Sequence, residues 1–200
     1  MKTKFLTTKR ISSIAILSAI AAVLMLFDFP ISFIAPSFYK MDISDLPCLI
    51  GTFALGPASG CIIELLKIIL KLIMKPTSTA FIGELSNFIC GISICIPAGL
   101  VYRKNHNKKG ALKAMIIGSV IFVIVSSISN YFVIIPAYVS LYHIPLETII
   151  DMGSAIFPFI SNKFMFVLVC VSLFNLFKAI IVDILTYLLY KRISPLLKGK

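Results

Sequence analysis

The sequence predicts an all-α integral membrane protein with six transmembrane helices, cytoplasmic N and C termini, and a lid-like outer loop between helices 1 and 2. The chain is 59% apolar and only 14% charged, and its mean hydropathy is +1.02. Soluble domains are about 45–50% apolar and about 25% charged. The basic residues lie in three clusters outside the apolar runs: Lys2, Lys4, Lys9 and Arg10; Arg103, Lys104, Lys108, Lys109 and Lys113; and Lys191, Arg192, Lys198 and Lys200. Since basic loops stay in the cytoplasm, these clusters mark the cytoplasmic side.

The first apolar run, Ile11–Phe27, is about long enough to span the bilayer. No small-residue cleavage site follows it, so we expect a retained helix and not a signal peptide. The next stretch, Asp28–Pro47, contains three prolines and three acidic residues. Proline opposes helix continuation, so this stretch predicts the outer loop.

The run Cys48–Met74 is too interrupted for a single span, because glycines and a Gly56-Pro57 step break it. It predicts a short second segment, a turn at Gly56-Pro57, and a third helix over Ala58–Met74. Short, broken helices of this kind line cavities in transporters.

Three further spans complete the bundle: Ala80–Tyr102 with a kink at Pro97, Ala111–Pro136, and Phe164–Tyr190. An outer loop is predicted over Tyr138–Lys163. Six spans place both termini and the Arg103–Lys109 loop on one side, in agreement with the basic clusters. The sequence shows no internal repeat, no low-complexity tract and no sign of a second domain. Residues 1–200 are therefore predicted to form a single six-helix membrane domain.

Asn175 and Lys178 lie one helical turn apart in the middle of the last span. A lysine at this depth costs roughly 3 kcal/mol on insertion scales. Residues three apart share a helix face, so the amide and the ammonium point to the same place. This pair predicts a polar ligand inside the bundle.

Asn87 and Asn130 are expected at a similar depth on two other helices, so the four groups could form one pocket. The alternative for each asparagine is an interhelical hydrogen bond, worth only about 0.6 kcal/mol. The first outer loop could close such a pocket through Tyr39, Met41, Asp42 and Asp45. The alternative for the two acids is a solvated loop in which Asp45 caps the next helix.

Two further patterns leave alternatives open. Glu64, Lys67 and Lys71 share one face of the third helix. They form either an internal Glu64–Lys67 pair with Lys71 extending to the interface, or a polar wall or subunit contact. On the first helix, Ala15 and Ala19 create a small-residue face that serves either internal packing or a partner helix.

Several functions are disfavoured by absent motifs. The chain has no P-loop motif, no G-x-S-x-G elbow and only two histidines, so an ATPase, a hydrolase and a metal site are not expected. Nucleic-acid binding is not expected, because the basic residues follow the membrane topology. The five cysteines, an odd number without C-x-x-C spacing, predict small buried apolar residues.

In order along the chain, several motifs resemble the riboflavin-binding S components of energy-coupling factor (ECF) transporters. They are Phe29-Pro30-Ile31, Lys40-Met41-Asp42-Ile43-Ser44-Asp45-Leu46-Pro47, the Gly51 to Gly60 block, Gly83-Glu84-x-x-Asn87-Phe88, Asn130-Tyr131-Phe132 before Pro136, Asn175-x-x-Lys178, and Tyr190-Lys191-Arg192-x-Ser194-Pro195. The resemblance implies a cell-membrane subunit that captures riboflavin from outside and is not an enzyme. It also implies a transmembrane coupling protein and two cytoplasmic ATPase subunits as partners, with riboflavin bound as transported substrate and not as cofactor.

Given riboflavin as the ligand that the resemblance implies, we hypothesise the following residue roles. Asn175 would pair with the N–H/C=O edge of the flavin, and Lys178 would donate to a ring carbonyl or nitrogen. Asn130 and Asn87 would complete the polar contacts, and the loop with Tyr39, Met41 and Asp42 would close the site, Asp42 accepting from ribityl hydroxyls. Ala15 and Ala19 would contact the coupling protein.

The sequence leaves two alternative functions open. One is an S component for another vitamin, such as thiamine, biotin, folate or pantothenate. The other is an ion- or proton-coupled secondary carrier in which Glu64, Glu84 and Asp183 titrate. A membrane enzyme is the weakest alternative, because no nucleophile–base pair or metal cluster is evident.

Overall fold

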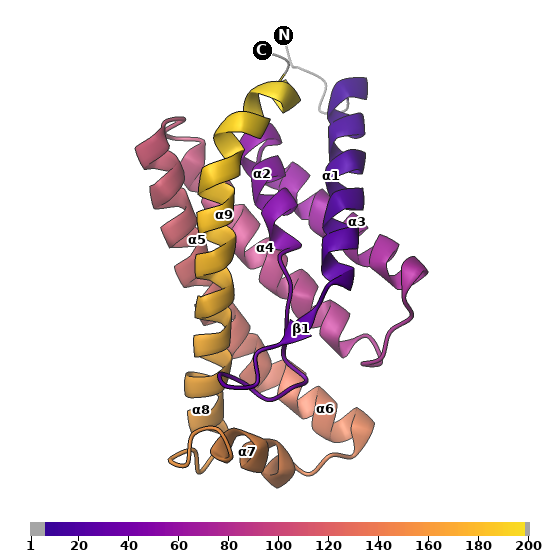
Figure 1. Cartoon of the computed structure of the whole chain (residues 1–200), viewed down its shortest axis with the longest axis vertical. Coiled ribbons are helices and arrows are strands. Elements are labelled where there is room, and N and C mark those ends of the chain that lie inside the picture. Colours follow the sequence, from indigo (N-terminus) through magenta and orange to yellow (C-terminus); the bar gives the residue numbers. More distant parts are fainter. Residues whose placement is uncertain (1–6, 199–200) are drawn as a thin grey trace.

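The computed structural model describes residues 7–198, and most of its helices run along the long axis of the molecule (Figure 1). The helices are α1 (Thr8–Leu26), α2 (Asp45–Leu55), α3 (Pro57–Met74), α4 (Ile82–Tyr102), α5 (Lys108–Ser129), α6 (Ile135–Tyr142), α7 (Leu146–Ser154), α8 (Lys163–Phe166) and α9 (Ser172–Lys198). Two π-helical turns, η1 (Asn130–Ile134) and η2 (Val167–Val171), join α5 to α6 and α8 to α9. The short strands β1 (Phe29–Pro30) and β2 (Lys40–Met41) pair antiparallel.

Four helical runs among the described residues are long and apolar enough to cross a membrane: Thr8–Leu26, Ile82–Tyr102, Lys108–Tyr142 and Lys163–Tyr190. α3 has 18 residues but carries three charged side chains, and α2 has only 11 residues. At 1.5 Å per residue, α2 spans roughly 16 Å, about half the hydrocarbon core. Length and composition alone therefore support a multi-pass protein with at least four spanning runs.

The predicted break in Cys48–Met74 is confirmed. α2 ends at Leu55, and α3 begins at Pro57, where a missing N–H costs no helical hydrogen bond. Gly56 between them has a φ of 97°, a conformation that favours glycine. The sequence therefore encodes a sharp reversal between two helices.

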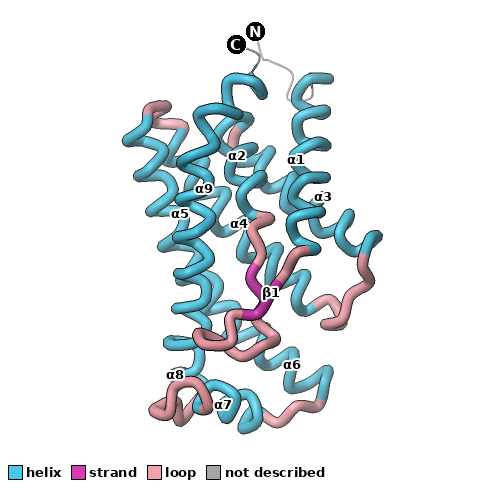
Figure 2. The backbone as a smooth tube through the Cα atoms, in the orientation of Figure 1, coloured by secondary structure: helices cyan, strands magenta, loops and turns pink. Residues whose placement is uncertain are grey.

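The segment between α1 and α2 enters the interior of the bundle. α2 begins only about halfway along the molecule, and the β1–β2 loop lies beneath its lower end (Figure 1). Figure 2 shows this segment as loop and strand crossing between the surrounding helices. Its residues Ile31, Ala35 and Met41 pack in a buried cluster with residues of η2 and α9.

The prediction of an outer loop over Tyr138–Lys163 is wrong in part. The fifth helical run continues through α6 to Tyr142, and α7 occupies Leu146–Ser154. Pro136 does not end the run, because it lies in the first turn of α6, directly after the wider turns of η1. The structure therefore extends this run by about a further turn and a half of helix.

The start of α1, the α4–α5 connection and the end of α9 lie at one end of the bundle (Figure 1). These positions carry the described basic residues Lys9, Arg10, Arg103 and Arg192, among others. Lys2, Lys4 and Lys200 of the predicted clusters lie outside the described residues. The α6, α7 and α8 helices lie at the opposite end.

Candidate ligand-binding site

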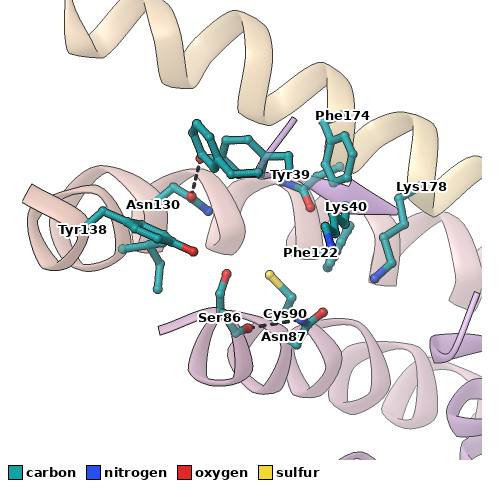
Figure 3. Close-up of a pocket in the computed structure, with 14 residues that line it drawn as sticks. Tyr39, Lys40, Ser86, Asn87, Cys90, Phe122, Asn130, Tyr138, Phe174 and Lys178 are labelled. Carbon is teal, nitrogen blue, oxygen red and sulfur yellow. Dashed lines mark hydrogen bonds between the residues drawn. The ribbon is translucent and has the colours of Figure 1, made fainter. Parts of the chain in front are cut away.

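A hollow lies between α4, the η1–α6 run, α9 and the loop before α2 (Figure 3). This inner chamber has a volume of about 90 Å³. Its walls include the aromatic residues Phe38, Tyr39, Phe122, Tyr138 and Phe174. Its polar groups are Lys40, Ser86, Asn87, Asn130, Asn175 and Lys178. Apolar walls with a few convergent polar groups are typical of small-molecule sites.

A second, outer chamber of about 360 Å³ adjoins the inner one. The two share the lining residues Phe38, Lys40, Gly83, Asn87 and Tyr138, so they lie next to each other. Asp28, Asp42, Lys71 and Glu84 make the outer chamber more highly charged. Together the two chambers reach the lower part of the roughly 300–1,000 Å³ range of ligand sites.

The three chamber asparagines are held in the same way. The side-chain N–H groups of Asn87, Asn130 and Asn175 donate to the carbonyls four residues earlier, at 3.1, 2.8 and 2.9 Å. Each amide has two donors and an acceptor oxygen, so one N–H is used and the second remains available. The amides are therefore fixed against their own helices while they line the chamber.

Both π-helical turns adjoin these asparagines. Asn130 is the first residue of η1, and Val171, whose carbonyl holds Asn175, is the last residue of η2. π-Helical turns inside α-helices occur frequently at functional sites. We find no feature of the sequence that predicts these turns, although both flank residues that the sequence marks as polar and intramembrane.

Tyr39 belongs to the chamber although it comes from the loop. Its hydroxyl donates to Oδ1 of Asn130 at 2.7 Å, as the dashed line in Figure 3 marks. Its ring centre lies 5.6 Å from that of Phe174 and 4.6 Å from that of Phe38. Desolvation raises the pKa of the Tyr39 phenol well above its usual value, so the phenol stays protonated and donates.

Lys178 reaches the chamber edge beside two carboxylates. Its Nζ lies 3.3 Å from Asp42 and 3.0 Å from Asp45. The other oxygen of Asp45 lies 2.7 Å from Lys67 Nζ, which also lies 2.6 Å from Glu64. We call these five buried residues the ion network. The solvated-loop alternative for Asp42 and Asp45 is wrong, because each is only 4% exposed.

The internal Glu64–Lys67 pair is confirmed, whereas Lys71 does not extend to the interface. Lys71 Nζ lies 2.6 Å from Glu84 on α4, and Thr77 and Thr79 donate to the same carboxylate at 2.9 and 3.0 Å. Glu84 and Lys71 both line the outer chamber, so this pair joins α3 to α4 there. Asp183, whose partner the sequence leaves unnamed, accepts a bond of 2.6 Å from Ser119.

The structure brings most of the predicted ligand residues together. Asn175, Lys178, Asn130, Asn87 and Tyr39 line the inner chamber. Asp42 lines the outer chamber and reaches the inner one through Lys178. Met41 lines neither chamber and packs in the buried cluster below α2.

Sequence reasoning missed several lining residues, namely Phe38, Lys40, Ser86, Cys90, Phe122, Tyr138 and Phe174. Some of these residues could have been predicted from their spacing along a helix relative to Asn87 and Asn130. Ser86 and Cys90 stand one residue before and three residues after Asn87, and Tyr138 stands eight residues after Asn130. Residues at these offsets share or border one helix face.

Ala15 and Ala19 are exposed on the surface of α1, beside the exposed Ile16 and Ile20. The side chains that pack inside the bundle from this helix are instead Ser13, Ile14, Leu17, Ser18, Ala21, Ala22 and Met25. Packing among residues 7–198, the part that the structure describes, therefore does not account for the two alanines.

Comparison with known proteins agrees with these features. Residues 9–190 match the family described as ECF transporter, substrate-specific component. The chain is 33% identical to the riboflavin transporter RibU of Staphylococcus aureus (95% of this chain, 93% of the relative) and 29% identical to the riboflavin transporter FmnP of Bacillus subtilis (94% and 93%). A solved S component of a bacterial ECF transporter superposes with a TM-score of 0.74 at 34% identity, covering 95% of this chain and 98% of that one. The chain belongs to the substrate-specific components of ECF transporters.

Proposed function

We propose that this chain is the substrate-capture subunit of an ECF-type transporter and binds riboflavin from outside the cell. The inner chamber is the observation that carries this proposal, because it joins aromatic walls to three anchored amides and one ammonium. Riboflavin has a flat ring system, a uracil-like polar edge and a hydroxylated ribityl tail. The names of the two riboflavin-transporter relatives support the same ligand.

We propose that each group of the cavity meets a particular part of riboflavin. Asn175 pairs with the N–H/C=O edge, and Lys178 donates to a ring carbonyl or nitrogen. Asn130 and Asn87 complete the polar contacts, and Phe174 and Tyr39 pack on the ring. The ribityl tail extends toward the charged outer chamber, where Asp42 accepts from its hydroxyls. Met41 supports the loop from below.

We further propose the topology and the partners. Residues 1–200 form one six-helix domain in the cell membrane, with α2 and α3 completing the bundle and both termini in the cytoplasm. The cavity then opens outward, since α6 and the loop after β1, which help to line it, lie in the half of the bundle away from the basic end (Figure 1). The loop before α2 acts as a lid. Riboflavin is cargo and not a cofactor, and ATP hydrolysis takes place on two ATPase subunits joined through a coupling protein.

The ion pairs of the buried glutamates also bear on the alternative of an ion-coupled carrier. Glu64 and Glu84 each lie 2.6 Å from a lysine, so both have a structural partner. These two pairs favour structural over titrating roles for Glu64 and Glu84; they do not bear on Asp183, which accepts a hydrogen bond from Ser119.

Asn175→Ala and Lys178→Ala are each expected to weaken riboflavin binding by about tenfold or more. The Lys178 ammonium is charged, and hydrogen bonds to charged groups contribute about 1.5–3 kcal/mol. Asn175 is neutral, but its amide would lose two bonds to the N–H/C=O edge, each worth about 0.5–1.5 kcal/mol. A difference of about 1.4 kcal/mol corresponds to tenfold. Quenching of flavin fluorescence on titration with the purified protein measures the affinity.

Asn105→Ala and Lys113→Ala are the matched controls, because both residues are exposed and lie away from the cavity. They should bind like the wild type. Absence of riboflavin binding by the wild type would refute the proposed ligand, and wild-type affinity in both chamber variants would refute the residue assignment.

A further inference from the structure

Asp45 lies behind the chamber and touches it only through another residue. It is the first residue of α2 and is 4% exposed. It is absent from the residues that line either chamber, whereas Lys178 lines the inner one. The contact that joins Asp45 to the inner chamber is therefore its ion pair with Lys178.

The two oxygens of Asp45 hold two different lysines. Oδ1 lies 2.7 Å from Lys67 Nζ, and Oδ2 lies 3.0 Å from Lys178 Nζ. Lys67 is 0% exposed and lies 2.6 Å from Glu64, so it fixes the carboxylate of Asp45 from the far side. Asp45 is thus pinned between α3 and α9.

The ammonium of Lys178 has three N–H donors. Asp45 and Asp42 lie within reach of two of them, at 3.0 and 3.3 Å. Figure 3 shows the Lys178 side chain extending from α9 into the hollow that Cys90, Asn87 and Phe122 border. One donor remains for a ligand there.

We infer that Asp45 is a positioning residue for flavin recognition, which orients the Lys178 ammonium so that its remaining N–H meets an acceptor on the polar edge of the ligand. This inference rests on the proposed function, because it assumes that the inner chamber takes that edge. Asp42 alone would orient the Lys178 ammonium less firmly, because it belongs to the loop and not to a helix. Its other oxygen already accepts hydrogen bonds from the backbone N–H and the hydroxyl of Ser44.

Asp45→Asn isolates this role. The substitution keeps the size of the side chain, and each lysine retains one carboxylate: Lys67 keeps Glu64, and Lys178 keeps Asp42. The network then contains two acids and two lysines, so the variant is expected to fold. Lys178 is expected to move toward Asp42 and to lose its alignment with the ligand.

The diagnostic measurement is the ratio of the affinities for riboflavin and for 2-thio- and 4-thioriboflavin, whose sulfur atoms are poor acceptors. Riboflavin is titrated by fluorescence quenching, and the thio analogues by competition. The wild type should prefer riboflavin over at least one analogue. That preference should fall toward one in Asp45→Asn and in Lys178→Met, and the double variant should bind riboflavin no more weakly than Lys178→Met.

A merely structural role would lower all three affinities alike and leave the ratio unchanged, which would overturn the inference. So would additive losses in the double variant. Asp183→Asn is the matched control, because Asp183 lies in a separate groove between α5 and α9 and bonds to Ser119; it should retain the wild-type ratio.

Two further outcomes separate this inference from the proposed function. If Lys178→Met loses the ratio and Asp45→Asn keeps it, the inference fails and the proposed function stands. If the wild type binds no riboflavin, both the inference and the proposed function fail. If Asp45→Asn does not fold, the same affinity ratio is measured for Asp45→Glu. The extra methylene of glutamate displaces Lys178 without removing the charge. A wild-type ratio in this variant would overturn the inference.

Discussion

Replacing Ala15 and Ala19 together with tryptophan is expected to abolish riboflavin uptake and leave riboflavin binding within a few-fold of the wild type. Both alanines are exposed on α1, four residues apart, so they form a shallow strip between larger aliphatic side chains. Such strips allow two membrane helices to approach closely, and bulky residues prevent that approach. Uptake by cells, co-purification with the coupling protein, and flavin quenching by the isolated subunit are the three measurements.

The matched control places the same two tryptophans on another lipid-facing strip. Ile124 and Ile128 on α5 have the same spacing and are 52% and 54% exposed. α5 lies across the bundle from α1 (Figure 1), so uptake should persist in this variant. Normal uptake in the alanine variant would exclude the strip as the partner contact, and loss of binding there would mean that α1 shapes the cavity.

The helical architecture could be predicted largely because it depends on local patterns. The apolar runs predicted the long helices, and the Gly56-Pro57 step predicted the break between α2 and α3. The depth at which α2 begins was not predictable in detail, since it depends on where the loop before it packs. The extension to Tyr142 was missed because Pro136 normally ends a helix, and only the π-helical turn η1 before it lets the run continue.

The site was predictable where a polar residue is costly in a membrane. Asn87, Asn130, Asn175 and Lys178 stand out for that reason, and all four line the inner chamber. The aromatic walls carry no such signal, because Phe122 and Phe174 look like ordinary membrane residues. The Glu64–Lys67 pair was predictable because its residues lie one helical turn apart. Partners from distant segments were not, since the Lys178–Asp42 contact joins positions 136 residues apart.

Lys67→Met is expected to lower the free energy of unfolding by about 3–5 kcal/mol, the usual effect of removing one partner from a buried ion pair. Methionine keeps most of the length and packing of the lysine stem but cannot neutralise a carboxylate. Lys67 and Glu64 are both 0% exposed, and a side chain at Gly91 would overlap the Glu64 carboxylate, so α4 leaves no room for compensating solvent. At roughly 2–4 °C per kcal/mol, the unfolding midpoint should fall by at least about 6 °C.

The measurement is thermal unfolding of the detergent-purified chain, followed by the reaction of a thiol dye with Cys48, Cys90, Cys95 and Cys170, which are buried when folded. Lys71→Met is the matched control, one turn further along α3. Its pair with Glu84 is just as short at 2.6 Å, but its side chain is 14% exposed at the outer chamber, and two threonines still bond to Glu84. It should cost less than Lys67→Met, because the Glu84 carboxylate keeps two hydroxyl donors. Equal midpoints for the two variants would contradict the expectation.

The double variant Lys67→Met/Glu64→Gln tests whether charge is the cause. The ion network of Asp42, Asp45, Glu64, Lys67 and Lys178 has three acids and two lysines, which is an excess of one negative charge when every group is ionised. Lys67→Met raises that excess to two, and adding Glu64→Gln returns it to one. A neutral amide also costs far less to bury unpaired than a carboxylate. The double variant should therefore unfold at a higher temperature than Lys67→Met alone, whereas a loss of packing would make it equally or less stable.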